Sequence, residues 1–249
     1  MLPFFFRHYD KLVDRYFIYD DGSTDATLEI LAAHSRVTVR RFERGSEGSF
    51  VLAEQACSNA CWKQSRGEAD WVIVTDIDEH LCHADLAGYL QACRDREVTL
   101  VPALGFQMVS EDLPQPGDRL CERHVMGTPW AKMMKPSIFD PTALEEINFR
   151  TGRHQADPTG RVSVPAGDEM LALHYKYMGF AETQARHEQL RLGLGTRDVQ
   201  EGWGHKYGWT AQELRDDWDK VSAGAVDVRR FLAEPQAYPL KRWWEKYRN

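Results

Sequence analysis

The sequence lacks several features that would place it in a special class of protein. No apolar run among its 249 residues approaches the roughly 18 that a membrane-spanning helix requires. The opening segment, 1–7, has neither the basic start nor the small-residue cleavage site of a signal peptide. A net charge of −7 leaves no basic footprint for a nucleic-acid backbone. These absences predict a cytoplasmic protein without nucleic-acid partners, with at most peripheral contact to the inner face of a membrane.

Cysteine is scarce, and its spacing indicates no disulfide framework. Five cysteines without paired spacings suit a reducing compartment better than a secreted protein. Cys57 and Cys61 lie four residues apart on a predicted helix and therefore share a face. The chain offers no second pair at zinc-site spacing, so small buried helix residues explain the two better than a metal site does.

What the sequence does contain indicates an α/β fold. Hydrophobic residues make up 43% of the chain and charged residues 28%, enough to bury a real core. Short strands and helices alternate in the first half, which favours a mainly parallel sheet flanked by helices. The expected strands are 15–19, 36–42, 71–75 and 98–104, and the expected helices are 27–34, 50–64 and 84–94.

The second half of the chain is organised differently. From Gly105 onward, prolines and glycines break the pattern into short pieces, which predicts loops that face a substrate. Helical periodicity returns over 179–192 and 211–221. We therefore expect a catalytic domain at 1–180 and a helical C-terminal extension at 181–249 packed on it.

The most informative segment is an apolar run that ends abruptly in acids. Residues 71–75 indicate a buried strand, and Asp76, Asp78 and Glu79 follow it at once. Ligands of open α/β sheets bind outside the carboxyl ends of the strands, so acids there can hold a cation and the phosphates it neutralises. A solvated strand-to-helix turn with an Asp as helix cap explains the same residues.

A second acidic turn follows the first expected strand, with the sequence Asp20-Asp21-Gly22-Ser23-Thr24-Asp25. Taken alone, it is explained by a glycine at positive φ and by a polar residue that caps the next helix. Two strands of one parallel sheet that both end in Asp pairs would place four carboxylates on one rim. Such carboxylates repel one another unless a cation or the donor groups of a ligand compensate them.

Together the two motifs resemble the family 2 glycosyltransferases and their relatives with the GT-A fold. The run Asp20 to Asp25 is similar to that family's first nucleotide-contacting turn, and Asp76-Ile77-Asp78-Glu79 is similar to its Asp-x-Asp metal motif. The resemblance covers about residues 3–180 and includes Leu173-His174-Tyr175-Lys176. One departure is that the family's first strand, with its polar nucleotide-contacting turn, has no counterpart ahead of Pro3.

The resemblance implies a metal-dependent, inverting transfer of a sugar from a nucleotide-diphosphate sugar, UDP-linked in the first instance, to a glycan or lipid-linked acceptor. Asp20 and Asp21 would accept hydrogen bonds from the base and ribose. Asp76 would lie near the ribose and the cation, and Asp78 would bind Mn²⁺ or Mg²⁺ at the diphosphate. His174 would complete the coordination, unless it is a core or capping histidine.

Inversion also requires a base that takes the proton of the acceptor. Glu111 and Asp112 follow an expected strand and are the nearest carboxylates, with Asp112 preferred, although a polar loop explains them equally well. Lys132 would stabilise the departing diphosphate and Trp130 would stack on a sugar. Alternatively, both are ordinary surface or packing residues. His154 would line the acceptor site or be a loop residue.

Three questions remain open at the level of sequence. The aromatic and basic ending, 241–248, would rest on an anionic membrane surface or pack on the domain. A catalytically silent nucleotide-sugar or glycan-binding module is compatible with the absent first strand. A haloacid-dehalogenase-like phosphatase also uses a strand-terminal Asp-x-Asp, but that motif normally opens the chain, whereas here it begins at Asp76. Oligomeric state is not predicted.

Overall fold

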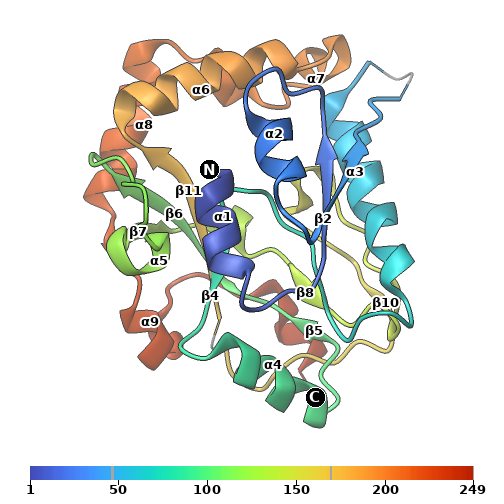
Figure 1. Ribbon diagram of the computed structural model, residues 1–249. Helices are drawn as coiled ribbons and strands as arrows, with labels where there is room; N and C mark the ends of the chain where they lie inside the picture. Colours follow the sequence, from blue (N-terminus) through green and yellow to red (C-terminus); the bar gives the residue numbers. More distant parts are fainter. Residues whose placement is uncertain (46–47, 169, 249) are drawn as a thin grey trace.

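Helices and strands interleave along the whole chain in the computed structural model, which describes residues 1–45, 48–168 and 170–248 (Figure 1). The α-helices are α1 (Leu2–Tyr9), α2 (Thr27–Ala32), α3 (Phe50–Ala60), α4 (Leu86–Asp95), α5 (Leu120–Arg123), α6 (Phe180–Gly193), α7 (Thr196–Gln200), α8 (Ala211–Ala223) and α9 (Arg230–Ala233). The strands are β1 (Tyr16–Asp20), β2 (Val37–Arg41), β3 (Val72–Ile73), β4 (Glu79–Cys82), β5 (Leu100–Val101), β6 (Leu104–Ser110), β7 (Met126–Pro129), β8 (Ile138–Phe139), β9 (Leu144–Glu146), β10 (Thr159–Gly160), β11 (Leu171–Met178) and β12 (Val226–Asp227).

The largest sheet has five strands in the order β12-β7-β6-β11-β4. Its central pair, β6 and β11, is parallel, whereas β4 and β7 run antiparallel to their neighbours. In this register His174 of β11 lies opposite Gln107 of β6 on one side and Glu79 of β4 on the other. Figure 1 shows α6 crossing the end of the sheet at which β11 finishes. The sheet therefore delivers three polar side chains to one place beneath that helix.

The expectation of a mainly parallel sheet is wrong, because the sheets are mixed. Parallel pairing occurs only in β1–β2 and β6–β11 among the described strands, and β3-β8-β5 is antiparallel throughout. Parallel neighbours need a crossover of a dozen or more residues. Only residues 74–78 separate β3 from β4, which turns into the other sheet and was not recognised because its sequence, Glu79-His80-Leu81-Cys82, is not strongly apolar.

The expected elements of the first half are otherwise largely found. β1, β2, β3, α2 and α4 lie at their expected positions, and the helix expected over 50–64 is α3 continued by a 3₁₀ segment, Cys61–Ser65. The expected strand 98–104 divides at Pro102 into β5 and β6, which belong to different sheets. The structure is thus α/β, with α2, α3 and α4 close to where periodicity indicates helices, an additional helix α1, and strands that pair differently.

A large cavity separates the sheet of β1 and β2 from the three-stranded sheet β3-β8-β5. It has a volume of about 1280 Å³ and is lined by residues of β1 on one side and by the segment 69–77 on the other, Asp20, Asp21 and Asp76 among them. Within the described residues β1 pairs with β2 alone, so its other edge borders this cavity. Helix α1 precedes β1 along the chain. The acidic ends of β1 and β3 therefore face a common space.

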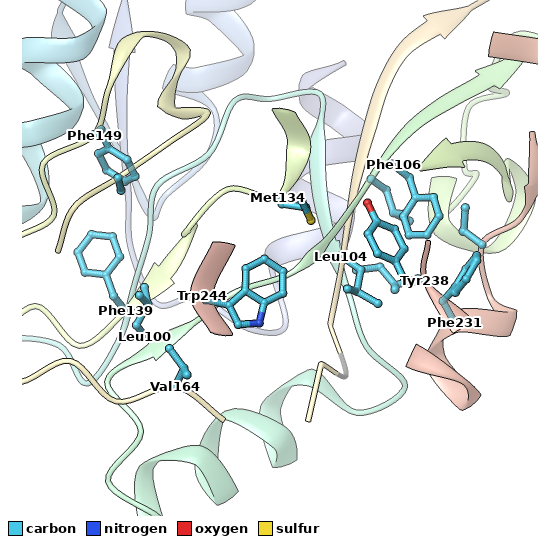
Figure 2. Packing of buried hydrophobic residues seen from close by; sticks show 14 of the residues in the cluster. Leu100, Leu104, Phe106, Met134, Phe139, Phe149, Val164, Phe231, Tyr238 and Trp244 are labelled. Carbon is cyan, nitrogen blue, oxygen red and sulfur yellow. The ribbon is translucent and has the colours of Figure 1, made fainter. Parts of the chain in front are cut away.

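The main core lies under the five-stranded sheet and includes the end of the chain. Figure 2 shows Trp244 among Leu100, Phe139 and Val164, with Tyr238 beside Phe106. The hydroxyl of Tyr238 donates to the carbonyl of Gly105 at 2.6 Å. The aromatic residues of the tail thus pack on the domain, whereas membrane contact and the division at residue 180 stay predictions. None of the described helices is both long and apolar enough to cross a membrane.

The buried histidine of α6 makes stability depend on pH. His187 is 4% exposed, and burial, reinforced by the nearby Lys176 charge, lowers its pKa to about 4. An imidazole in the unfolded chain has a pKa of about 6.5. At a pH between the folded and the unfolded pKa, only the unfolded chain binds the proton. The free energy of unfolding should therefore fall by about 2 kcal/mol from pH 7 to pH 5 through this group.

Urea denaturation at the two pH values tests this expectation. The variant His187→Leu has no proton to bind in either state, so its loss of stability between pH 7 and pH 5 should be smaller than that of the parent by about 2 kcal/mol. Equal losses in parent and variant would mean that His187 does not stay neutral in the folded protein.

Candidate functional site

The centre of the candidate site is a carboxylate and an imidazole held side by side. Asp78 is 4% exposed and directly precedes β4, and its carbonyl accepts the backbone N–H of Tyr175 at 2.7 Å. This bond fastens the acidic turn to β11. The Nε2 atom of His174, one residue earlier on β11, lies 3.5 Å from Oδ2 of Asp78. Residues almost a hundred positions apart are thereby brought into contact.

The neighbouring glutamine determines which nitrogen of His174 carries the proton. The amide nitrogen of Gln107 donates to the carbonyls of Met108 at 2.9 Å and His174 at 3.1 Å. Its oxygen, Oε1, is left facing Nδ1 of His174 at 2.8 Å and must accept a hydrogen bond from that atom. In the neutral imidazole, the lone pair of Nε2 then faces Asp78, which is how metal-binding histidines are commonly oriented by a second residue.

Asp78 also meets a cation from the helix above. Nη2 of Arg186, on α6, lies 3.0 Å from the same carboxylate oxygen. Burial alone would raise the pKa of Asp78, but the surrounding positive charge, chiefly that of Arg186, outweighs it and holds that pKa well below its usual range. Asp78 is therefore ionised at any pH at which the protein is expected to work.

A buried network of ion pairs lies beside the acidic turn between β3 and β4. The carboxylate of Glu79 is 1% exposed and contacts the ammonium of Lys135, and Nη2 of Arg153 lies 3.2 Å away. Burial opposes ionisation of Glu79, yet Lys135 and Arg153 lower its pKa. Arg153 also donates to the carbonyl of Val74 at 2.7 Å, at the end of β3. The network thus ties together the two segments on either side of the acidic turn.

The carboxylate of Asp76 belongs to this network. Its Oδ1 lies 2.8 Å from Nη2 of Arg153 and its Oδ2 3.8 Å from Nζ of Lys135. The side chain of Asp76 is 55% exposed and lines the cavity. Asp76 and Asp78 therefore do not converge with His174. Among the described residues, no group of three or more His, Cys, Asp or Glu side chains could hold a metal ion.

The first acidic turn uses one of its carboxylates locally. Asp20 accepts the backbone N–H of Gly22 at 2.9 Å and of Ser23 at 3.1 Å, and hydrogen bonds from Ser23 and Gly22 lower its pKa. Asp21 forms an ion pair with Arg44, whose Nε lies 2.8 Å from Oδ1. Both acids line the cavity. Their contact with a base or ribose stays a prediction.

The two candidate bases lie beyond the end of β6. Oε1 of Glu111 accepts the indole N–H of Trp218 at 2.9 Å and lies 3.8 Å from Arg215, so this carboxylate is held against α8. Asp112 is exposed, and its backbone carbonyl accepts the hydroxyl of Ser110 at 3.0 Å. The carboxylate of Asp112 is thus the freer of the two, and its role as base stays a prediction.

Trp130 stands beside the central pair. Its ring stacks on that of His174, with centroids 5.6 Å apart and an angle of 20° between planes. Lys132 is exposed, and its carbonyl forms a hydrogen bond with Nδ1 of His154 at 2.8 Å. The structure therefore joins Trp130 to the site through His174, while the contacts expected of Lys132 with a diphosphate and of His154 with an acceptor stay predictions.

Four residues of this site were missed by sequence reasoning: Gln107, Lys135, Arg153 and Arg186. Their partners are distant in sequence, 67 positions for Gln107 and His174 and 56 for Lys135 and Glu79, so local periodicity carries no sign of them. A single polar residue within the buried strand β6 was the one available signal, since buried polar side chains are usually paired.

Comparison with known proteins corrects the family assignment. The family model described as Glycosyltransferase family 92 matches residues 1–192. A search of curated proteins finds no match. The identification with family 2 is therefore wrong. It rested on strand-end carboxylates, which recur wherever a sheet binds a cation and phosphates and do not distinguish one such family from another.

Proposed function

The chain belongs to glycosyltransferase family 92, and from this we propose that it moves a sugar from a nucleotide-diphosphate sugar, UDP-linked, to a glycan or lipid-linked acceptor. Glycosyltransferase activity follows from the family. The donor class, the acceptor, the cation and a GT-A arrangement of the nucleotide-binding part are our proposals. The observation that supports a cation, and with it a diphosphate donor, is the pairing of Asp78 with the free Nε2 lone pair of His174.

A divalent cation would be held by Asp78 and His174. One carboxylate oxygen and one imidazole nitrogen, 3.5 Å apart, form a donor set that suits Mn²⁺ better than Mg²⁺. Gln107 fits this role as the residue that orients the imidazole. Two protein ligands leave positions for water and phosphate oxygens. Once bound, the cation would neutralise charge on the leaving diphosphate.

The cavity supplies a place for the nucleoside. Asp20, Asp21 and Asp76 line its rim and present carboxylates that accept hydrogen bonds from hydroxyl and N–H groups. Trp130, stacked on His174, presents an aromatic surface at the point where a sugar would follow the diphosphate. Asp112 is our choice for the base that takes the acceptor's proton, which accords with an inverting reaction.

A thermal-shift panel tests the donor and the cation together. The protein is heated with UDP, GDP, CMP or TDP, each with and without Mn²⁺. We expect UDP to raise the melting temperature and Mn²⁺ to enlarge that shift, because a ligand that binds only the folded state stabilises it by mass action.

The same panel has outcomes that contradict the proposal. A larger shift with another nucleotide would replace UDP as the proposed donor nucleotide. A shift with UDP that does not change when Mn²⁺ is added would exclude the cation from the proposed function. Nucleotide binding without release of UDP from a UDP-sugar, in the presence of glycan acceptors, would favour the silent binding module.

A further inference from the structure

More positive charge converges on Asp78 than one carboxylate can neutralise. Arg186 reaches it from α6, and Lys176 lies two residues beyond His174 on β11. The Nζ atom of Lys176 donates to the hydroxyl of Tyr207 at 3.1 Å and stands 4.3 Å from the centre of that ring. In the part of the chain that the structure describes, Lys176 forms no ion pair. The cluster of Asp78, Arg186 and Lys176 therefore carries one net positive charge.

The surroundings of Lys176 destabilise its charged form in the protein without ligand. Its side chain is half-buried, and the positive charges of Arg186 and Lys206 lie nearby. The carboxylate of Asp217 does not compensate Lys176, because it is paired with Lys206 at 3.1 Å. A cation that is half-buried, near other cations and bonded to neutral Tyr207 is stabilised by an arriving anion.

Arg186 is able to change partners. Its side chain is 32% exposed and its guanidinium touches Asp78 through one nitrogen, so donors remain for another acceptor. A guanidinium matches two oxygens of a phosphate at once. If a divalent cation neutralises Asp78, like-charge repulsion favours movement of Arg186 toward that acceptor.

We propose that Arg186 and Lys176 form a binding site for the diphosphate of the nucleotide sugar, with Tyr207 holding Lys176 in place. In the free protein Arg186 acts as the counter-ion of Asp78, and in the complex it binds phosphate oxygens. This inference rests on the proposed function for the identity of the ligand. The site itself requires only a diphosphate, so inorganic pyrophosphate probes it without a base or a sugar.

Isothermal titration of the full chain with pyrophosphate, UDP and uridine tests the site, each with and without Mn²⁺. We expect Arg186→Gln to weaken the binding of pyrophosphate and of UDP by at least about tenfold and to leave the affinity for uridine unchanged. Only charged hydrogen bonds to phosphate are lost in this variant. Arg186→Lys should recover part of the affinity. Lys176→Gln should weaken the same two ligands.

Arg191→Gln is the matched control, since it removes the same charge from an exposed position on the same helix. It should leave all three affinities within about twofold, as expected of a remote, screened charge. Urea denaturation of each variant without ligand verifies that it is folded. A variant that does not fold is replaced by Arg186→Lys, for which a measurable loss of pyrophosphate affinity is expected.

The outcomes separate this inference from the proposed function. If the parent binds UDP and Arg186→Gln binds it equally well, the diphosphate site is overturned and the proposed function stands. If the parent binds pyrophosphate through Arg186 but no nucleotide, the site stands and the proposed donor is wrong. If the parent binds neither ligand, both are overturned.

Discussion

Replacing Asp78 by asparagine is expected to reduce the rate of sugar transfer by at least about 100-fold. Losses of this size are typical when one group that stabilises the charge of the transition state is removed. The side chain keeps its size, and the bond from Tyr175 is to the backbone carbonyl, so the turn should persist. What disappears is the negative charge that would hold the cation beside His174 and that pairs with Arg186.

The measurement is the initial rate of UDP release from a UDP-sugar in the presence of acceptor, as a function of Mn²⁺ concentration. Asp219→Asn, an exposed change on α8, is the matched control and should keep the parent rate. A variant Asp78→Asn with the parent's rate and the parent's response to Mn²⁺ would exclude Asp78 as a cation ligand.

Replacing Glu79 by glutamine is expected to lower the free energy of unfolding by about 3–5 kcal/mol, the usual cost of breaking a buried ion pair from one side. Glu79 is 1% exposed, Lys135 5% and Arg153 2% in their side chains. The substitution leaves both cations buried with only Asp76 and Glu54 to compensate them. The effect is large because neither cation can reach water.

Urea denaturation at neutral pH measures this loss, with Glu145→Gln as a control at an exposed position of β9 that should change stability by less than about 0.5 kcal/mol. Removing one cation as well, in Glu79→Gln with Lys135→Met, should restore part of the stability, since fewer buried charges remain unpaired. A Glu79→Gln variant as stable as the parent would show that water or a rearrangement compensates the two cations.

The carboxylates of the site were predictable because they belong to local patterns. An apolar run followed at once by acids marks the carboxyl end of a buried strand, and this occurs at Asp20 and again at Asp76. Helical periodicity located α2, α4, α6 and α8 for the same reason, since each buries one face. The family assignment was wrong because such patterns describe a kind of site rather than a lineage.

The sequence by itself determined that the protein is α/β, where the helices α2, α3, α4, α6 and α8 lie, and that acids stand at strand ends. Only the tertiary structure decided that Asp76 joins Arg153 while Asp78 joins His174 and Arg186, because the chain turns at residues 77–78 between β3 and β4. It also decided the mixed pairing of the strands. These are contacts between residues far apart in the chain, and they depend on which edges and charges meet when the sheets pack, a relation that no local pattern encodes.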